Sequence, residues 1–346
     1  MPALQKGDKV LVTGANGYLA LWAVQKHLEH GYAVRASVRS EEKASLLREY
    51  FQAFADRLEI VIVTDMTKPG AFNDAVKGVD GIQHMASPTE VDSDDPDAYV
   101  KPAVEGTMGL LQSALLHGST VKRVIYTSST GTLFTPGCPP TTWNENDWND
   151  KAVETIRREG KHAPRHMMYL ASKVLAERAA WEFWEKHKTG IDWDFLSITA
   201  PWLLGPSLIP IARPDWLNGS LRIFYENCIK QGPHTREVLA GANTWVDTRD
   251  LADAYVKALE TEEAGGERLI IAKGIASWQD WINVMNSLGD TAPHRSQPLP
   301  KGYPDLQGNY INRYDVTKAT KILNPTLRGM EETARDMLLQ WTSIGY

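Results

Sequence analysis

A tyrosine and a lysine four residues apart, within residues 168–173, carry the clearest potential chemistry of this chain. Good helix formers follow them, so the stretch predicts a helix. Side chains at positions i and i+4 share a helix face, which would point the Tyr169 phenol and the Lys173 ammonium into the same space. A phenol beside a fixed positive charge can exchange a proton with a substrate. Alone, this spacing usually marks a solvated helix face, and it becomes informative only with a cofactor, a third polar group and a cleft.

Ser129 is the candidate for the third polar group. It ends a run of small polar residues that follows a predicted buried strand over 121–127. Open parallel α/β sheets bind ligands beyond the carboxyl ends of their strands, so Ser129 and the adjacent Thr130 are placed to face a cleft. The alternative is a turn serine whose hydroxyl caps its own backbone.

A glycine-rich turn indicates where a cofactor would lie. A β-branched strand ends in Thr13-Gly14-Ala15-Asn16-Gly17-Tyr18-Leu19-Ala20, and a helix to about residue 30 and a second strand over 33–38 follow. Gly14 permits a tight turn, and Gly17 lets the backbone approach a pyrophosphate. The helix N-terminus offers N–H groups and the positive end of its dipole to the phosphates. Within a βαβ unit this pattern predicts dinucleotide binding, although Ala20 occupies the third small position and a glycine turn without a ligand is the alternative.

The end of the second strand predicts which dinucleotide binds. An NAD enzyme would place Asp or Glu about 20 residues beyond the glycines to hold the ribose diol. Arg39 stands there instead, and Lys43 follows. A guanidinium can hold a phosphate through two parallel hydrogen bonds, so we expect NADP(H). The alternative is a surface arginine that pairs with Glu41 or Glu42.

Three other strand ends should border the cofactor for the same topological reason. Asp65 and Met66 follow the third predicted strand, where the carboxylate could accept a hydrogen bond from adenine or cap the next turn. Ala86 and Ser87 follow the fourth strand and are small enough for phosphates and ribose to lie close. Thr127 ends the fifth strand, immediately before the serine run.

The order of the elements predicts an α/β fold, a Rossmann-type doubly wound parallel sheet with a smaller, discontinuous C-terminal substrate domain. Strands and helices alternate through the first two hundred residues, and then a Pro- and Trp-rich segment interrupts them. We predict an NADP-binding domain over 1–200 and 238–276. The substrate-binding domain should comprise 201–237 and 277–346.

Composition excludes several classes of protein. The chain has 346 residues, 42% hydrophobic and 23% charged, which is ordinary for a soluble globular protein. A net charge of -6 gives no basic surface for nucleic acid. No apolar run approaches the length of a membrane span. The two cysteines, Cys138 and Cys228, stand in no disulfide or metal-like spacing, so we expect a cytoplasmic protein with no metal site.

The combined motifs resemble the extended short-chain dehydrogenase/reductases. Within that family the chain is similar to the NADPH-dependent aldehyde and ketone reductases related to dihydroflavonol reductases. The resemblance covers most of the chain and rests on Thr13-Gly14-x-x-Gly17-x-x-Ala20, on residues 34–39, 99–107 and 124–129, and on Tyr169-x-x-x-Lys173. The Asn-Trp-Tyr sequence typical of cinnamoyl-CoA reductases is missing before the lysine, which weakens the case for a lignin-pathway substrate.

The resemblance implies a catalytic trio. Tyr169 would protonate the substrate oxygen, Ser129 would hydrogen-bond the same oxygen, and Lys173 would favour the phenolate and hold the nicotinamide ribose. Pro201 falls where the family places backbone against the nicotinamide carboxamide. Many relatives carry a catalytic asparagine at the position of Ala103, so a proton relay through that side chain is not supported here.

Two sets of residues summarise the expected site. The cofactor-binding set is Thr13, Gly14, Asn16, Gly17, Tyr18, Leu19, Arg39, Lys43, Asp65, Met66, Ala86, Ser87, Thr127, Tyr169, Lys173, Pro201, Leu203 and Leu204. The substrate pocket set is Ser129, Thr130, Trp202, Trp216, Phe224 and Trp245, of which the aromatic members could equally be packing residues.

We therefore expect an NADPH-dependent carbonyl reductase that converts bulky or aromatic aldehydes and ketones to alcohols, with Tyr169 as proton donor. One alternative is an epimerase or dehydratase of the same fold that retains NAD, and Arg39 counts against it. The other is a non-catalytic NADP sensor, which would need neither Tyr169 nor Lys173. The expected partner is a small carbonyl compound, and the protein could be a monomer or a homodimer.

Overall fold

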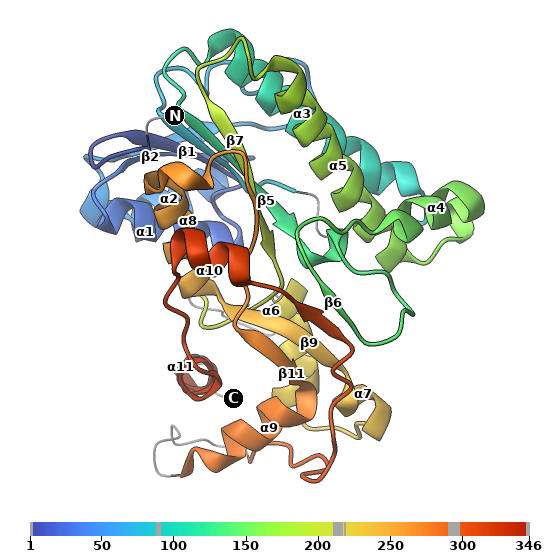
Figure 1. Ribbon diagram of the computed structural model, residues 1–346. Helices are drawn as coiled ribbons and strands as arrows, with labels where there is room; N and C mark the ends of the chain where they lie inside the picture. Colours follow the sequence, from blue (N-terminus) through green and yellow to red (C-terminus); the bar gives the residue numbers. More distant parts are fainter. Residues whose placement is uncertain (1–2, 88–90, 210–216, 218, 290–297, 344–346) are drawn as a thin grey trace.

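The computed structural model describes residues 3–87, 91–209, 217, 219–289 and 298–343. Within these residues, seven parallel strands form one twisted sheet in the order β10-β7-β5-β4-β1-β2-β3 (Figure 1). The chain order reverses beside β1, as in a doubly wound sheet. The predicted Rossmann-type α/β fold is thereby confirmed. The strands are β1 (Lys9–Thr13), β2 (Ala33–Val38), β3 (Leu58–Ile62), β4 (Gly81–His84), β5 (Arg123–Ser129), β7 (Asp194–Ala200) and β10 (Arg268–Ile270).

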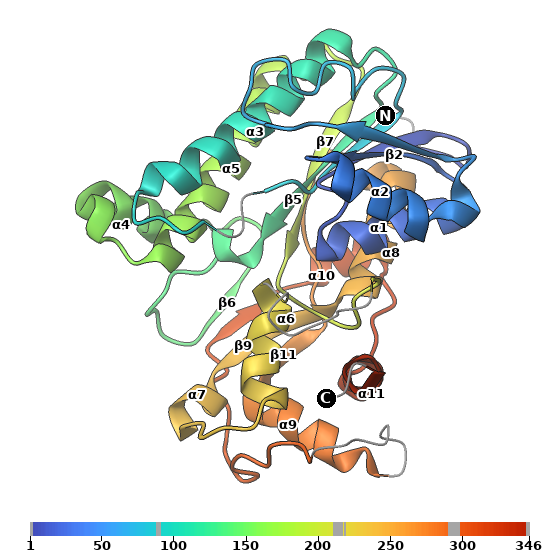
Figure 2. The ribbon, with the colours of Figure 1, turned by 180° about the vertical axis from the view of Figure 1, so that it is seen from behind.

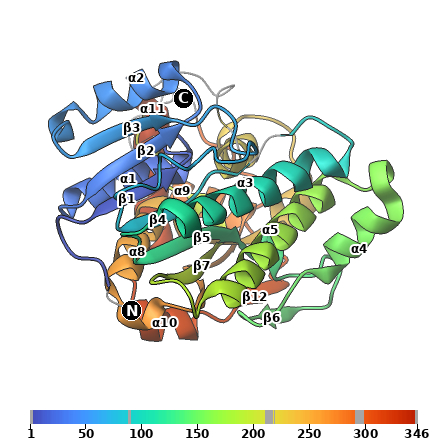
Figure 3. The same cartoon turned by 90° about the horizontal axis from the view of Figure 1, so that it is seen from above.

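Helices cover both faces of this sheet (Figure 3). One layer comprises α1 (Tyr18–Glu29), α2 (Glu41–Tyr50), α8 (Thr248–Glu260) and α10 (Thr317–Leu323), and the other comprises α3 (Pro96–His117) and α5 (Arg165–His187). Alternation along each strand divides the core between the two layers. In β1, for example, Val10 and Val12 join the cluster beneath α1, whereas Leu11 joins the cluster beneath α3. Because both faces are covered, β1 and β7 are almost entirely buried, whereas β3 at the edge of the sheet is partly exposed.

A smaller unit lies beyond the carboxyl end of the sheet (Figure 2). Three described strands form its sheet in the order β11-β9-β8. Its core gathers aromatic side chains around Trp281 and Trp341, each 1% exposed, so much of the tryptophan content serves packing. The elements are β8 (Trp202–Leu204), α6 (Gly219–Phe224), α7 (Arg236–Ala240), β9 (Ala242–Asp247), β11 (Gly274–Ser277), α9 (Trp278–Ser287) and α11 (Met330–Ser343).

The division of the chain differs from the predicted boundaries. Strands β9 and β11 were expected in the nucleotide-binding domain, but they pair with each other and β9 pairs with β8 in the smaller sheet. Conversely, α10 was expected in the smaller domain, but its Ala319 and Leu323 join the core of the large sheet. Sequence periodicity identifies strands, and it does not reveal which sheet a strand joins.

The proline-rich insertion between β5 and α5 is ordered by a distant partner. Its strand β6 (Thr141–Trp143) pairs in parallel with β12 (Asn312–Tyr314) near the end of the chain. The helix α4 (Asp150–Glu159) then packs beside α5 (Figure 1). Among the described residues, no helix has both the length and the apolar character needed to cross a bilayer.

Candidate active site

The glycine-rich turn after β1 lies against the end of β4. Gly14 has φ +63°, and a Cβ at this position would lie 2.9 Å from the Cα of Ala86. The buried Thr13 fixes this approach, because its hydroxyl accepts hydrogen bonds from the backbone N–H groups of Met85 and Ala86, each at 3.0 Å. The turn therefore needs glycine for both its backbone angle and its contact.

The N-terminus of α1 begins at a glycine. Gly17 is the N-cap residue in an extended conformation, and it makes no side-chain cap hydrogen bond to the first turn of the helix. The first N–H groups of a helix have no intrahelical partner. The turn and helix end therefore fit a pyrophosphate, which would accept hydrogen bonds from these groups and benefit from the helix dipole.

Arg39 is available to a ligand. It lies exposed at the end of β2 and makes no ion pair or hydrogen bond with any residue that the structure describes. The neighbouring acids have other partners, since Glu41 pairs with Arg48 and Glu42 pairs with Lys43 at 3.5 Å. Glu41 and Glu42, the partners considered for a surface ion pair with Arg39, therefore both pair with other residues.

Asp65 fills one of the two roles considered for it. One carboxylate oxygen accepts hydrogen bonds from the backbone N–H and the hydroxyl of Thr67, at 3.0 and 2.7 Å. These bonds hold the pKa of Asp65 below its usual range. Met66 packs against α3, where a Cβ on Gly106 would lie 2.3 Å from the Met66 Cε. Asp65 therefore caps its own turn, and a cofactor contact there stays a prediction.

Ser129 and Tyr169 face each other across the end of the sheet. Ser129 ends β5, and its hydroxyl oxygen accepts from the backbone N–H of Gly131 at 3.1 Å. Tyr169 lies on α5, partly buried. Burial raises the pKa of Tyr169, and a hydrogen-bonding interaction with the Ser129 side chain opposes that increase. The turn role of Ser129 and its role beside Tyr169 thus coexist.

Lys173 extends from α5 to the ends of β4 and β5. It is 6% exposed. Its Nζ donates to the Ser87 hydroxyl at 3.3 Å and to the Thr127 carbonyl oxygen at 3.4 Å, and it lies 5.8 Å from the centre of the Tyr126 ring. Burial lowers the pKa of Lys173 to about 8, against the opposing charge of Glu177. The predicted neighbours Ser87, Thr127, Tyr169 and Lys173 therefore converge at one strand edge.

The electrostatic role predicted for Lys173 is not reflected in the pKa of Tyr169. We expected its charge to favour the Tyr169 phenolate, but burial dominates and the pKa of Tyr169 lies above its ordinary value. The Lys173 ammonium is directed to Ser87 and Thr127 instead. Tyr169 therefore keeps its proton at neutral pH, as an ordinary tyrosine does.

A buried hydroxyl and a histidine lie near the position without asparagine. Thr107, one turn beyond Ala103, donates its hydroxyl hydrogen bond to the Ala103 carbonyl oxygen at 2.8 Å. The same hydroxyl lies 3.4 Å from Nε2 of His84, whose Nδ1 is 2.8 Å from the Thr13 hydroxyl. These groups tie α3 to the cofactor turn.

The segment after β7 contains Pro201, the residue that was predicted to lie against the nicotinamide. Pro201 follows β7 directly, and the next residues form β8, in which Trp202 and Leu203 are partly exposed and Leu204 is buried. Trp202 packs edge-to-face on Trp278, with ring centres 5.3 Å apart. One side of Trp202 thus belongs to the core of the smaller unit, and the exposed remainder is available as a pocket wall.

Two residues predicted to line the substrate pocket lie in the core instead. Phe224 is 0% exposed and Trp245 is 3% exposed. Both contact Trp281 edge-to-face, at 5.5 and 4.8 Å between ring centres. Their aromatic character is explained by packing, so their placement does not support pocket roles. Trp216 lies outside the described residues, and Thr130 is buried beside Ser129.

A buried ion pair behind α5 was not predicted from the sequence. Glu177 is 0% exposed and pairs with Arg268 of β10 at 2.9 Å. Its carboxylate also accepts from the hydroxyls of Ser128 and Ser197. Although burial raises it, Arg268 and these hydroxyls hold the pKa of Glu177 below its usual range. One signal was available: Glu177 follows Lys173 by four residues, on the same helix face.

The fold and this site define a dinucleotide-dependent enzyme of the extended short-chain dehydrogenase/reductase class. A family model described as the NAD dependent epimerase/dehydratase family matches residues 10–272. The chain belongs to this family.

Several reductases resemble the chain over nearly its whole length. It is 32% identical over 334 residues to the ketoreductase azaE of Aspergillus niger, with 95% of this chain and 96% of that protein covered. It is 29% identical to aldehyde reductase 2 of Sporidiobolus salmonicolor, over 97% and 96% of the two chains. The solved structure of yeast methylglyoxal/isovaleraldehyde reductase Gre2 complexed with NADPH matches with a TM-score of 0.84 at 28% identity, covering 96% of this chain and 97% of that chain. The prediction of an oxidoreductase of the aldehyde and ketone reductase branch is confirmed.

Proposed function

We propose that this protein reduces the carbonyl group of an aldehyde or ketone to an alcohol with NADPH as cofactor. The observation that carries the proposal is the convergence of Ser129, Tyr169 and Lys173 at the strand edge that also bears the glycine-rich turn. The family relatives named as reductases support the reaction class. The unpaired Arg39 supports a cofactor with a 2′-phosphate.

NADPH, when bound, supplies the hydride. Residues of the protein supply the proton and stabilise the charge that develops on the substrate oxygen. Tyr169, which is protonated at neutral pH, donates its proton to the carbonyl oxygen as that oxygen becomes an alkoxide, and burial, by raising the pKa of Tyr169, extends the protonated form to higher pH. The Ser129 hydroxyl donates a hydrogen bond to the same oxygen and lowers the energy of the developing charge. Lys173 adds a positive charge in a buried setting, where charges act more strongly than in water.

The preference for a bulky or aromatic substrate forms a finer part of the proposal. Its support is the partly exposed ring of Trp202 beside the predicted nicotinamide segment. The buried positions of Phe224 and Trp245 narrow that support to fewer aromatic residues than the sequence suggested. The free cysteines Cys138 and Cys228 fit a reducing compartment, so the proposal includes a cytoplasmic setting.

Tyr169→Phe tests the assignment of the proton donor. The variant keeps the ring that packs in the site and removes only the hydroxyl. We expect NADPH oxidation with a panel of aldehydes and ketones to fall by at least about 10²-fold, while NADPH binding measured by fluorescence titration is retained. Near-normal turnover in the variant would contradict the assignment.

The same measurements separate the competing activities. An epimerase or dehydratase of this fold would retain NAD through purification and would oxidise no added NADPH in the presence of carbonyl compounds. A non-catalytic sensor would bind NADPH and respond to no substrate in the panel. Carbonyl-dependent NADPH oxidation that is lost in Tyr169→Phe is the result expected for a reductase alone.

A further inference from the structure

The loop that follows β8 is hydrogen-bonded to the first turn of α1. Tyr18 is the first residue of α1, and its hydroxyl donates to the carbonyl oxygen of Gly205 at 2.7 Å. One helical turn later, Nε1–H of Trp22 donates to the carbonyl oxygen of Pro206 at 2.9 Å. These bonds join positions that are 187 and 184 residues apart in the chain. They connect the element that follows the glycine-rich turn directly to the smaller unit.

The Tyr18 side chain is built into the smaller unit. Its ring packs against the hydrophobic cluster that contains Leu204 and Met337, even though its backbone belongs to the nucleotide-binding fold. Burial raises the pKa of Tyr18. The hydroxyl is therefore protonated throughout the working pH range and is a permanent donor to Gly205.

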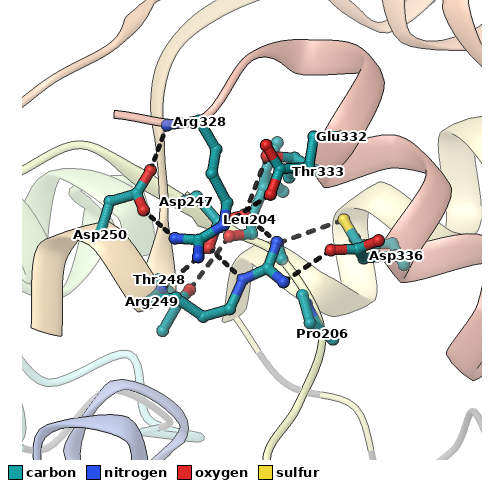
Figure 4. A network of polar contacts seen from close by, with 12 residues as sticks. Leu204, Pro206, Asp247, Thr248, Arg249, Asp250, Arg328, Glu332, Thr333 and Asp336 are labelled. Atoms are coloured by element: carbon teal, nitrogen blue, oxygen red, sulfur yellow. Dashed lines mark hydrogen bonds and ion pairs between the residues drawn. The ribbon is translucent and has the colours of Figure 1, made fainter. Parts of the chain in front are cut away.

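The loop that receives these bonds is also held from its other side (Figure 4). Gly205 has φ +126°, and a Cβ there would lie 3.0 Å from the Asp247 carboxylate. The Gly205 N–H donates to the Met337 sulfur at 3.2 Å, and the Thr248 hydroxyl donates to the Leu204 carbonyl oxygen at 3.1 Å. The loop is therefore held by Asp247 and Met337 of the smaller unit and by Thr248 of α8, in addition to Tyr18.

The Asp247 carboxylate behind this loop is itself neutralised and immobilised. It accepts from the Arg249 guanidinium at 2.8 Å and from the Thr333 hydroxyl at 2.8 Å. Arg249 continues to Asp336 of α11 at 2.6 Å (Figure 4). A charged network thus joins β9, α8 and α11 beneath the loop. Because α8 also packs on the large sheet, this network links the loop to both units.

We propose that Tyr18, supported by Trp22, is a positioning residue that fixes the spacing between the two ends of the cofactor site. This inference rests on the proposed function. The phosphate end is the turn at Gly14 and Gly17, which the large sheet holds. The nicotinamide end is the predicted contact segment of Leu203 and Leu204, which leaves that sheet after β7 and leads directly into Gly205. An extended dinucleotide must contact both ends at once. Two ends held at a fixed spacing bind such a ligand without a further ordering cost.

This role separates ligands that reach both ends from ligands that reach one. NADPH spans the phosphate turn and the nicotinamide segment. Adenosine 2′,5′-bisphosphate carries the adenine, the 2′-phosphate and one 5′-phosphate, and it has no nicotinamide. Loss of the Tyr18 hydroxyl should weaken the binding of NADPH and leave the binding of adenosine 2′,5′-bisphosphate unchanged.

The experiment compares Tyr18→Phe with Tyr32→Phe by calorimetric titration with both ligands. Tyr32 is the matched control, because its buried side chain also loses one hydroxyl hydrogen bond, to Glu260 at 3.0 Å, outside the proposed site. We expect Tyr18→Phe to lower the affinity for NADPH by about tenfold, because the buried carbonyl of Gly205 is left without its hydrogen-bond donor. Its affinity for the bisphosphate should stay within about twofold of the unaltered protein, and Tyr32→Phe should change neither.

Each other outcome counts against the inference. Unchanged NADPH affinity in Tyr18→Phe would overturn it. An equal loss for both ligands would assign Tyr18 to the local shape of the phosphate turn and would also overturn it. Trp22→Phe, measured in the same way, should reproduce the selective loss. If the unaltered protein bound neither ligand, the cofactor assignment itself would fall, and the positioning role with it.

Discussion

Lys173 presents the sharpest energetic conflict at the scale of single residues. Its ammonium is 6% exposed, and its hydrogen-bond partners Ser87 and Thr127 are neutral. Burial lowers the pKa of Lys173 from its ordinary value of 10.5 to about 8. At about 1.4 kcal/mol per pKa unit, this shift corresponds to roughly 3 kcal/mol of folding stability lost at neutral pH. Burial of Lys173 thus destabilises the fold at neutral pH, which agrees with the catalytic role proposed for it.

Replacing Lys173 with methionine should separate activity from stability. The folded protein binds fewer protons than the unfolded chain between pH 8 and 10.5, so the stability of the unaltered protein should rise across that window. Lys173→Met should be more stable at pH 7, by roughly 1–3 kcal/mol, and should lack that rise. Carbonyl reduction should be lost. Urea unfolding at pH 7 and pH 10 measures this, and parallel pH dependence in the two proteins would contradict it.

Arg39 should determine the choice between the two nicotinamide cofactors. A charge-assisted hydrogen bond to phosphate contributes about 1.5–3 kcal/mol, and an acid in its place would repel that phosphate. Arg39→Asp should therefore lower the ratio of kcat/KM for NADPH to that for NADH by about 10²-fold. Arg48→Asp is the matched control, because Arg48 lies on the neighbouring helix and pairs with Glu41 at 2.5 Å. An unchanged ratio in Arg39→Asp would leave Arg39 as a surface residue.

At the scale of elements, α5 carries the site on one face. Tyr169, Lys173 and Glu177 follow one another at intervals of four residues, so their side chains line the helix toward the sheet. Glu177 joins the helix to β5 through Ser128, to β7 through Ser197 and to β10 through Arg268. The Arg268 guanidinium also donates to Thr132 and stacks 3.8 Å from the centre of the Trp148 ring in the insertion. The buried ion pair thus positions the helix and the insertion together.

Breaking this ion pair should be costly. Glu177→Gln would leave the Arg268 guanidinium buried without a counter-charge, and such a change costs about 3–5 kcal/mol. Glu185→Gln on the same helix is the matched control, because Glu185 is exposed and pairs with Lys188, and surface pairs contribute about 0–1 kcal/mol. The free energy of unfolding in urea measures both. Equal effects of the two variants would show that the buried pair does not hold the helix, and adding Arg268→Met to Glu177→Gln should recover part of the loss.

At the scale of the whole molecule, two buried histidines should make the free energy of unfolding fall as the pH falls below 6.5. Burial lowers the pKa of His27 to about 4, against a hydrogen bond with Gln83, and burial with the Lys173 charge lowers that of His84 to about 3. Both folded pKa values lie below the unfolded value of 6.5. Their contribution to stability is therefore complete above pH 6.5 and is lost as the pH falls toward 4 and 3.

The protein should consequently lose about 2 kcal/mol of stability per histidine between pH 6.5 and pH 5. Urea unfolding at pH 7, 6 and 5 measures the loss. His27→Gln, which keeps a side chain able to hydrogen-bond to Gln83, should remove about half of the histidine-dependent part. A pH dependence identical to that of the unaltered protein would show that His27 does not titrate in this way.

Local patterns in the sequence determined the class of the fold and the centre of the site. The glycine-rich turn, the Tyr169–Lys173 spacing and the serine run each depend on residues within a few positions of one another, and helix and strand geometry fixes their relations. Among the described residues Arg39 has no partner, and Lys173 donates to Ser87 and Thr127; the binding roles of these residues stay predictions.

Only the tertiary structure decided the contacts between distant segments. The hydroxyl of Tyr18 donates a hydrogen bond to Gly205, Glu177 forms an ion pair with Arg268, and β9 joins the smaller sheet. It also placed Phe224 and Trp245 in a core, although their residue type suits a pocket equally well. The physical reason is that local geometry relates residues within a helical turn or along a strand, whereas these partners are chosen when whole layers pack and bury their faces together.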